Sequence, residues 1–126
     1  EFHGEFVDFD PVYCQPKPAQ QPIPILVGGH SNRAAQRAGE LGDVLFPAER
    51  PVETLISLHS LAKEFAEKAG RDPAKIELWT SSNGDSSHLD QLVEAGVSQV
   101  MVPARPPEQL AERYAQLIAD YDLEDA

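Results

Sequence analysis

The stretch Ile25-Leu26-Val27-Gly28-Gly29-His30-Ser31 decides the fold of this chain of 126 residues. Its first three residues form a short apolar run that the glycine pair ends, which is typical of a strand buried on both faces of a parallel sheet. Ser31 or Asn32 can then cap a helix, because their side-chain oxygens accept from the unpaired amides of its first turn. Small apolar residues follow at helical spacing up to Gly42, where a left-handed C-terminal cap is expected.

Three further units of the same kind follow along the chain. The predicted elements are strands over 43–46, 76–80 and 100–102 and helices over 51–69, 87–95 and 106–121. Strands that alternate with helices form a parallel sheet, because each crossover helix returns the chain to the same end of the sheet. The sequence therefore predicts the α/β class, with four consecutive strand–helix units over residues 23–126.

Two architectures accommodate four such units. One is half of a (β/α)8 barrel, because a complete barrel of eight units typically needs about 250 residues. The other is a small open parallel sheet of the flavodoxin-like type. Both place ligands beyond the carboxyl ends of the strands, where loops lead into helices.

The patterns within the helices make more detailed predictions. One apolar stripe is expected to bury the second helix against the sheet. Its members are Leu55, Leu58, Ala62, Phe65 and Ala69. At the start of the third helix, Ser87 and Asp90 resemble a capping box.

Residues 1–22 are expected to form an extended, proline-rich arm. Five prolines within the first 24 residues exclude a helix there, because each fixes φ, removes an N–H and favours extended structure in the residue before it. One short strand is expected over 6–9. The chain begins with Glu1 and its only methionine is Met101, so we expect residues 1–126 to be a single domain or a fragment of a longer protein.

The composition excludes several classes of partner. Ten basic and 21 acidic residues give a formal net charge of −11 at pH 7, which disfavours nucleic acid and anionic membrane surfaces. No apolar run approaches the roughly 20 residues of a membrane-spanning helix. Cys14 is the only cysteine, so a reducing, cytoplasmic location is expected. The histidines lie far apart in the sequence, so no metal site is expected.

The loop formed by Gly28, Gly29, His30 and Ser31 is the candidate ligand site. Two glycines let the backbone approach an anion closely, and the free amides at the helix start point outward with the positive end of the helix dipole behind them. Ser31 adds a hydroxyl and His30 an imidazole donor. The loop therefore predicts a phosphate-binding site, and plain tight-turn chemistry is the alternative.

Several spaced motifs occur in a fixed order along the chain. They are Phe2-His3-Gly4-Glu5, Val7-Asp8-Phe9 and Pro16-Lys17-Pro18 in the arm, then Pro22 to Ser31, Ala34-Ala35, Arg37-Ala38 and Leu41-Gly42-Asp43, and finally Ala69 to Pro73 and Ala95-Gly96-Val97. Taken together, these motifs resemble the luciferase-like monooxygenase family. The resemblance spans nearly the whole chain and is strongest from Phe2 to Phe46. One departure is that Val44 and Leu45 follow the glycine–aspartate pair, where the family often has glycine and tryptophan.

The resemblance implies the C-terminal half of a (β/α)8 barrel, strands five to eight, which binds FMN or its deazaflavin analogue. In that family the loop after strand five holds the cofactor phosphate, and this loop corresponds here to Gly28, Gly29, His30 and Ser31. The implied activity is that of a flavin- or deazaflavin-dependent oxidoreductase, by monooxygenation or hydride transfer, on a small organic substrate. Catalytic residues stay unknown, because the family's cofactor-ring contacts come largely from the other half. This chain alone is therefore expected to be inactive.

A non-catalytic half-barrel module that binds a phosphorylated ligand or a partner is the alternative function. Four parallel strands cannot close a barrel, so the sheet edges and the apolar face need to be covered. We therefore expect a homo-oligomer or pairing with the missing half of the barrel.

For the remaining candidate side chains, we expect structural or surface roles. Glu49 and Arg50 are expected to form a solvated ion pair, and Cys14 to be an unactivated thiol. Trp79 is expected in the core, with a place on the barrel interior as the alternative. Arg105 is expected to pair with Glu108 at the surface, with a contact to a cofactor tail or an anionic substrate as the alternative.

Overall fold

A parallel sheet of four strands forms the centre of the molecule. The computed structural model describes residues 1–13, 15–83, 85–102 and 107–121. The strands are β3 (Leu26–Gly28), β4 (Val44–Phe46), β5 (Glu77–Ser81) and β6 (Gln99–Met101), and they lie in the order β3-β4-β5-β6. All three neighbouring pairs are parallel. The predicted α/β class is therefore confirmed, with strand ends that differ from the predicted ones by at most one residue.

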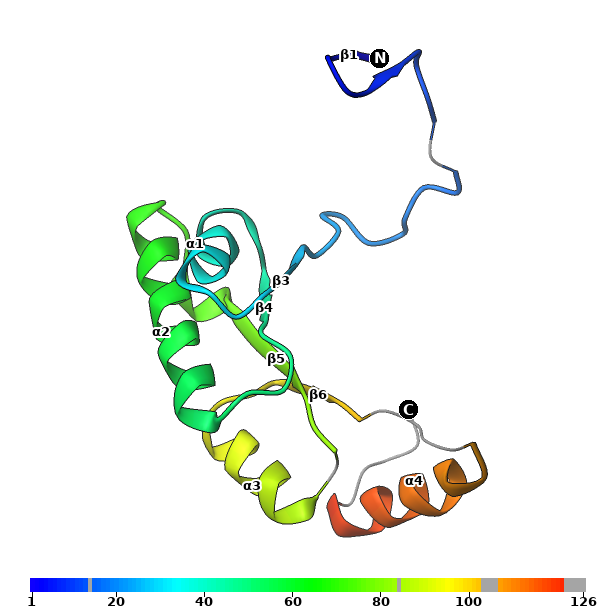
Figure 1. Cartoon of the computed structure of the whole chain (residues 1–126), viewed down its shortest axis with the longest axis vertical. Coiled ribbons are helices and arrows are strands. Elements are labelled where there is room, and N and C mark those ends of the chain that lie inside the picture. The colour runs from blue at the N-terminus through cyan, green and yellow to red at the C-terminus, as the bar shows by residue number, and fades with distance from the viewer. Residues whose placement is uncertain (14, 84, 103–106, 122–126) are drawn as a thin grey trace.

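The helices connect these strands. They are α1 (Asn32–Leu41), α2 (Val52–Lys68), the short 3-10 helix η1 (Pro73–Lys75), α3 (Ser86–Glu94) and α4 (Pro107–Tyr121). Helices α1, α2 and α3 lie on the same side of the sheet, as Figure 1 shows. When every crossover has the same hand and leads to the next strand, all crossover helices lie on one face of the sheet.

The order of the strands distinguishes the two architectures. A flavodoxin-like sheet reverses its strand order at a switch point and carries helices on both faces. Here the strands of the described sheet follow the chain order, as in a segment of a (β/α)8 barrel. The face away from the helices is open, and Leu26 and Met101 on it are each 42% exposed.

The core lies between the sheet and the three helices on its covered face. Its buried members are Ala35, Ala38, Leu45, Leu55, Leu58, Ala62, Ala66, Ile76, Leu78, Leu89 and Leu92. Small residues of α1 let it approach α2 closely: a Cβ on Gly39 would clash with the carbonyl oxygen of Ala62. The chain therefore packs these two helices almost backbone to backbone.

The buried stripe of α2 differs in part from the predicted one. Leu55, Leu58 and Ala62 are buried as predicted, whereas Ala69 lies outside the helix and is exposed. His59 and Ala66 are buried instead. Together with Leu55 and Ala62, these two residues have strict helical spacing. Histidine is usually found at the surface, so the apolar pattern alone does not predict that His59 is buried.

Two predicted helix caps are corrected. Gly42 has φ −99° and ψ 170°, which is extended and not left-handed. Glycine is needed there for space, because a Cβ would lie 2.7 Å from Cγ2 of Val27. Helix α3 is capped by Asp85, whose carboxylate accepts from the amides of Ser87 and His88, so the capping box expected at Ser87 is wrong.

The N-terminal segment stretches away from the sheet (Figure 1). Within it, β1 (Phe2–His3) pairs antiparallel with β2 (Asp8–Phe9), and the rings of Phe2 and Phe9 stack with centroids 6.1 Å apart. The single strand expected over 6–9 is therefore half as long and belongs to a hairpin. No helix occurs among the described residues of this segment, as the prolines require.

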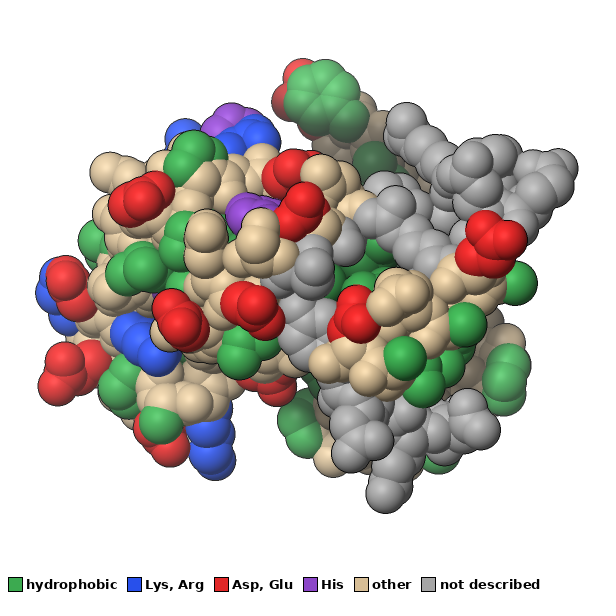
Figure 2. Space-filling view, turned by 90° about the horizontal axis from the view of Figure 1, so that it is seen from below, with side chains coloured by type: hydrophobic (Ala, Val, Ile, Leu, Met, Phe, Trp, Pro, Cys, Tyr) green, Lys and Arg blue, Asp and Glu red, His purple; other side chains and the backbone are tan. Residues whose placement is uncertain are grey.

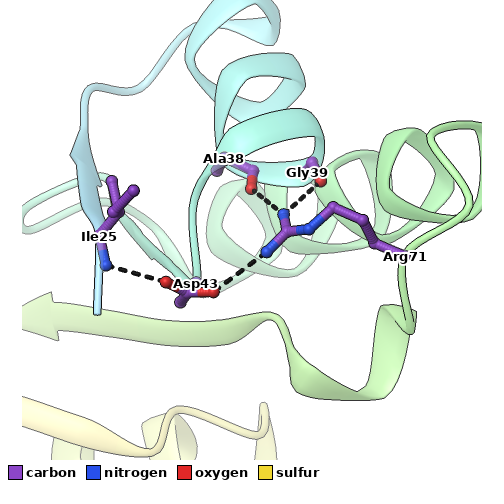
Figure 3. Close-up of polar contacts among 5 residues, drawn as sticks. All are labelled: Ile25, Ala38, Gly39, Asp43 and Arg71. Atoms are coloured by element: carbon purple, nitrogen blue, oxygen red, sulfur yellow. Dashed lines mark hydrogen bonds and ion pairs between the residues drawn. The ribbon is translucent and has the colours of Figure 1, made fainter. Parts of the chain in front are cut away.

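Asp43 joins the amino ends of three strands. Its carboxylate accepts from the amide of Ile25 at 2.9 Å and from Nη2 of Arg71 at 3.0 Å. Its backbone amide donates to the Ile25 carbonyl and its carbonyl accepts from the Glu77 amide. Arg71 also donates to the carbonyl of Gly39 at 2.7 Å, so the same guanidinium holds the end of α1 (Figure 3).

We predict that Asp43→Ala lowers the free energy of unfolding by about 1–3 kcal/mol, because an amide and a guanidinium lose their acceptor. The ion pair is partly exposed and contributes the smaller share. Urea titration followed by circular dichroism measures the change. Glu67→Ala is the matched control, because this exposed glutamate on α2 has no side-chain partner among the described residues. Equal stability of the two variants would contradict the assignment.

His59 makes the fold sensitive to acid. Burial lowers the pKa of its imidazole, opposed by the hydrogen bond to the Ile76 carbonyl, and Lys63 lowers it further. Nε2 lies 2.7 Å from that carbonyl oxygen and donates to it. The neutral ring is therefore favoured in the folded state. The contribution of the neutral His59 to the free energy of unfolding is fully present above the usual histidine pKa of about 6.5. This contribution is lost as the pH falls through the lower pKa of the folded state.

We predict that His59→Gln, which keeps an N–H donor but does not titrate, loses less stability than the parent between pH 7.5 and pH 5. The difference has the sign that the lowered pKa of His59 requires. Urea unfolding at the two pH values measures it, with the parent chain as the reference. Identical pH profiles for His59→Gln and the parent would contradict this role.

Candidate functional site

The candidate loop leaves β3 at the carboxyl end of the sheet and enters α1. Gly29 has φ +126°, a conformation that L side chains rarely adopt, and a Cβ there would lie 3.0 Å from Cβ of Ala34. Its amide donates to the carbonyl of Phe46 at 3.0 Å. Gly29 therefore makes the turn and ties it to β4, and its amide is not a free donor.

Gly28 has a different role in the same loop. It is exposed, and a Cβ added there would meet nothing within 4 Å. The fold of the described residues therefore does not require glycine at this position. The open space beside its backbone lies at the end of the sheet where parallel α/β proteins bind ligands.

Ser31 caps α1, as the sequence predicted. Its Oγ accepts from the Ala34 amide at 3.3 Å, and its carbonyl accepts from the amides of Ala34 and Ala35. The hydroxyl hydrogen stays available as a donor because the oxygen acts as acceptor. The amides of Asn32 and Arg33 have no partner among the described residues, as expected in a first helical turn.

Arg50 comes from the next loop and contacts the candidate site. Its Nη2 lies 2.9 Å from Nδ1 of His30, and its Nη1 donates to the carbonyl of Glu49 at 2.6 Å. A guanidinium only donates, so Nδ1 of His30 is the acceptor and the ring proton is on Nε2. The expected ion pair with the Glu49 carboxylate is not among the ion pairs of the described residues.

Arg50 was expected at the same mouth as the phosphate loop, but in a solvated ion pair with Glu49 and not in contact with that loop. Loops that follow neighbouring parallel strands meet at the same edge of the sheet. Because β3 pairs with β4 in register up to Gly28 and Phe46, the residues a few positions later had to lie close together. The position of Arg50 was therefore predictable, whereas its hydrogen bond to His30 was not.

A second constraint holds the loop between β4 and α2. Ala48 has φ +60°, in the left-handed region that non-glycine residues seldom adopt. The hydroxyl of Thr80, which is fully buried, donates to the Ala48 carbonyl at 2.7 Å. Thr80 on β5 therefore fixes the strained turn that leads to Arg50.

An open groove begins at Arg50. Its volume is about 570 Å³, and Glu49, Arg50, Pro51 and His88 line it. A neighbouring hollow of about 350 Å³ shares Glu49 and His88 and extends along the start of α3. Arg50 thus lies between the glycine loop and this groove.

Trp79 is not a core residue, which corrects the expectation. Residues alternate between the two faces of a strand, and its neighbours Leu78 and Thr80 face the helices. Trp79 therefore lies on the open face, where its Nε1 donates to a carboxylate oxygen of Glu77 at 2.7 Å. The Ser98 hydroxyl donates to the same oxygen at 3.0 Å.

Other predictions concern residues outside the described ranges, metal sites and membrane-spanning helices. Cys14 and Arg105 lie outside the described residues. Among the residues that are described, no cluster of three or more histidine, cysteine or acidic side chains could hold a metal ion. In the same part of the chain, no helix has the length and apolar character needed to cross a membrane.

Parallel strands in chain order, with helices on one face and a glycine loop at the carboxyl end, define a segment of the (β/α)-barrel class. The chain belongs to the luciferase-like monooxygenase family, whose family model matches residues 1–124. The resemblance seen in the sequence is thereby confirmed.

The chain is also similar to individual proteins. Uncharacterized proteins of Mycobacterium bovis and Mycobacterium tuberculosis are each 36% identical over 108 residues, which is 85% of this chain and 37% of theirs. The coenzyme F420-dependent tetrahydromethanopterin reductase of Methanopyrus kandleri is similar in structure, with a TM-score of 0.60 over 75% of this chain and 49% of that one, at 15% identity. This likeness shows the fold. The chain spans less than half the length of these proteins.

We predict opposite outcomes for the two glycines of the loop. Gly29→Ala should lower the free energy of unfolding by about 1–2 kcal/mol, because alanine is strained at this positive φ. Gly28→Ala should change it by less than about 0.5 kcal/mol, because the added methyl group meets open space. Urea titration of both variants provides the comparison, with Gly28→Ala as the internal control. Equal losses in the free energy of unfolding would show that strain at Gly29 is not what destabilises the variant.

Proposed function

We propose that this chain supplies the cofactor-phosphate loop of a flavin- or deazaflavin-dependent oxidoreductase, acting by monooxygenation or hydride transfer. The observation that carries the proposal is the open space beside Gly28 at the carboxyl end of β3. Hydrogen-bond donors surround the loop that borders this space, namely the first-turn amides of α1 and the Ser31 hydroxyl. A phosphate dianion matches such a set of donors.

Each residue of the loop has its own role in this proposal. Gly28 leaves room for the phosphate next to the backbone, and Gly29 makes the turn that presents the start of α1. Ser31 offers its hydroxyl hydrogen while its oxygen caps the helix. His30 accepts from Arg50 and so keeps Nε2–H as a further donor.

The proposed phosphate carrier is FMN or a deazaflavin coenzyme of the F420 type. Membership in a monooxygenase family supports redox chemistry, and the F420-dependent reductase of Methanopyrus kandleri shares the fold. Both carriers place a phosphate on a ribityl-type chain, so one loop can hold either. The ring of the bound cofactor would supply the hydride or oxygen chemistry, and the protein supplies position and electrostatics.

The rest of the barrel belongs to the same proposal. The sheet face opposite the helices exposes Leu26 and Met101, and β3 and β6 are its free edges. We infer that another barrel half, or a second copy of this chain, covers that face and supplies the residues that contact the cofactor ring and a small organic substrate. The single cysteine fits a reducing compartment such as the cytoplasm.

We predict that the protein expressed from its complete gene binds FMN or coenzyme F420 more tightly than riboflavin or the phosphate-free deazaflavin alcohol. Gly28→Val should weaken binding of the phosphorylated form at least about tenfold, equivalent to 1.4 kcal/mol, because the side chain fills the space for the phosphate. Fluorescence titration measures both affinities, and Gly28→Ala should have a smaller effect.

Two controls make this result interpretable. Urea unfolding should show that Gly28→Val is as stable as the parent, and its affinity for the phosphate-free compounds should be unchanged. An absorbance spectrum of the purified protein identifies which cofactor it carries. A protein that binds other phosphorylated ligands but neither cofactor would contradict the proposed function and favour a non-catalytic binding module.

A further inference from the structure

Arg50 is a partly buried cation that has no counter-ion among the described residues. Among the described residues, its hydrogen-bond partners are Nδ1 of His30 and the carbonyl of Glu49, and both are uncharged acceptors. The ion pairs of this part of the chain involve other basic groups. The remaining N–H groups of the guanidinium are therefore available to an acceptor from outside.

The lack of an ion pair does not by itself set Arg50 apart. The sequence has 21 acidic residues for ten basic ones, and carboxylates are spread over the face seen in Figure 2, with fewer basic side chains. Arg71 is paired with Asp43 at 3.0 Å, but Arg33, Arg37 and Lys63 have no ion pair among the described residues either. Arg50 differs from these three in its place, because its guanidinium hydrogen-bonds His30 of the candidate loop at the carboxyl end of the sheet.

The backbone around Arg50 is held in place before any ligand binds. Ala48 is fixed in its left-handed conformation by the buried hydroxyl of Thr80. Pro47 is fully buried and Pro51 precedes α2, so the turn has little freedom. Such pre-organisation lowers the entropy lost when an anion binds.

We propose that Arg50 is the anion-binding side chain of this site and that it contacts the phosphate held by the Gly28–Ser31 loop. His30 also positions Arg50, because its Nδ1 accepts from the guanidinium. The inference rests on the proposed function, and it adds a charged contact from a second loop to a site otherwise built from uncharged donors. Arginine suits this role because its planar fork can meet two phosphate oxygens at once.

The test measures affinity for FMN and coenzyme F420, and for their phosphate-free forms, in the protein expressed from its complete gene. Arg50→Gln should weaken binding of the phosphorylated form at least about tenfold and leave the phosphate-free form within about twofold. Arg50→Lys should lie between Arg50→Gln and the parent, because a lysine keeps the charge but not the fork. Arg37→Gln, which removes an exposed arginine from α1, should change neither affinity.

His30 is tested by rescue. His30→Ala should weaken binding of the phosphorylated form severalfold, and His30→Asn should restore most of it, because the asparagine oxygen replaces Nδ1 as acceptor. A merely structural loss would not be repaired by that exchange. The salt dependence of binding should also decrease in Arg50→Gln, since one charged contact is removed.

The outcomes separate the two proposals. If the parent protein binds a phosphorylated cofactor and Arg50→Gln binds it equally well, the role of Arg50 is overturned while the proposed function stands. If the parent binds neither cofactor, both proposals fail. Equal losses for phosphorylated and phosphate-free forms would also overturn the role of Arg50, because they would indicate a general change of the pocket.

Discussion

The fold depends on the carboxylate of Asp43. It accepts from the Ile25 amide where β3 begins and from Arg71 beyond the end of α2, while the backbone of the same residue bonds to Ile25 and Glu77. Strands of three to five residues have little capacity to fix their own register. A polar clamp at their amino ends supplies it, and the alternation of buried and open faces follows from that register.

The stabilising clamp and the proposed binding loop thus lie at opposite ends of one sheet. The clamp of Asp43 and Arg71 lies at the amino ends, and the loop around Gly28 and Arg50 lies at the carboxyl ends. In barrel proteins the first end is usually structural and the second carries function. Polar groups at the site can therefore stay unsatisfied without loss of the fold, because the register is set elsewhere.

The sequence predicted what depends on local pattern. Alternation of strands and helices, the cap at Ser31 and the turn at Gly28–Gly29 were all recoverable, since each is encoded within a few residues. Features that depend on contacts between distant residues were not. Gly42 is required by its closeness to Val27, and the hydrogen bond between Arg50 and His30 joins two separate loops.

The hydrogen bond from Thr80 to the Ala48 carbonyl has a consequence for how this family can diversify. The threonine is buried on the helix-facing side of β5, beneath the mouth and out of reach of any ligand. An exchange at that hidden position would let the overlying turn relax and re-aim the arginine that follows it. Evolution could therefore alter ligand preference from within the interior, with every residue at the entrance left unaltered.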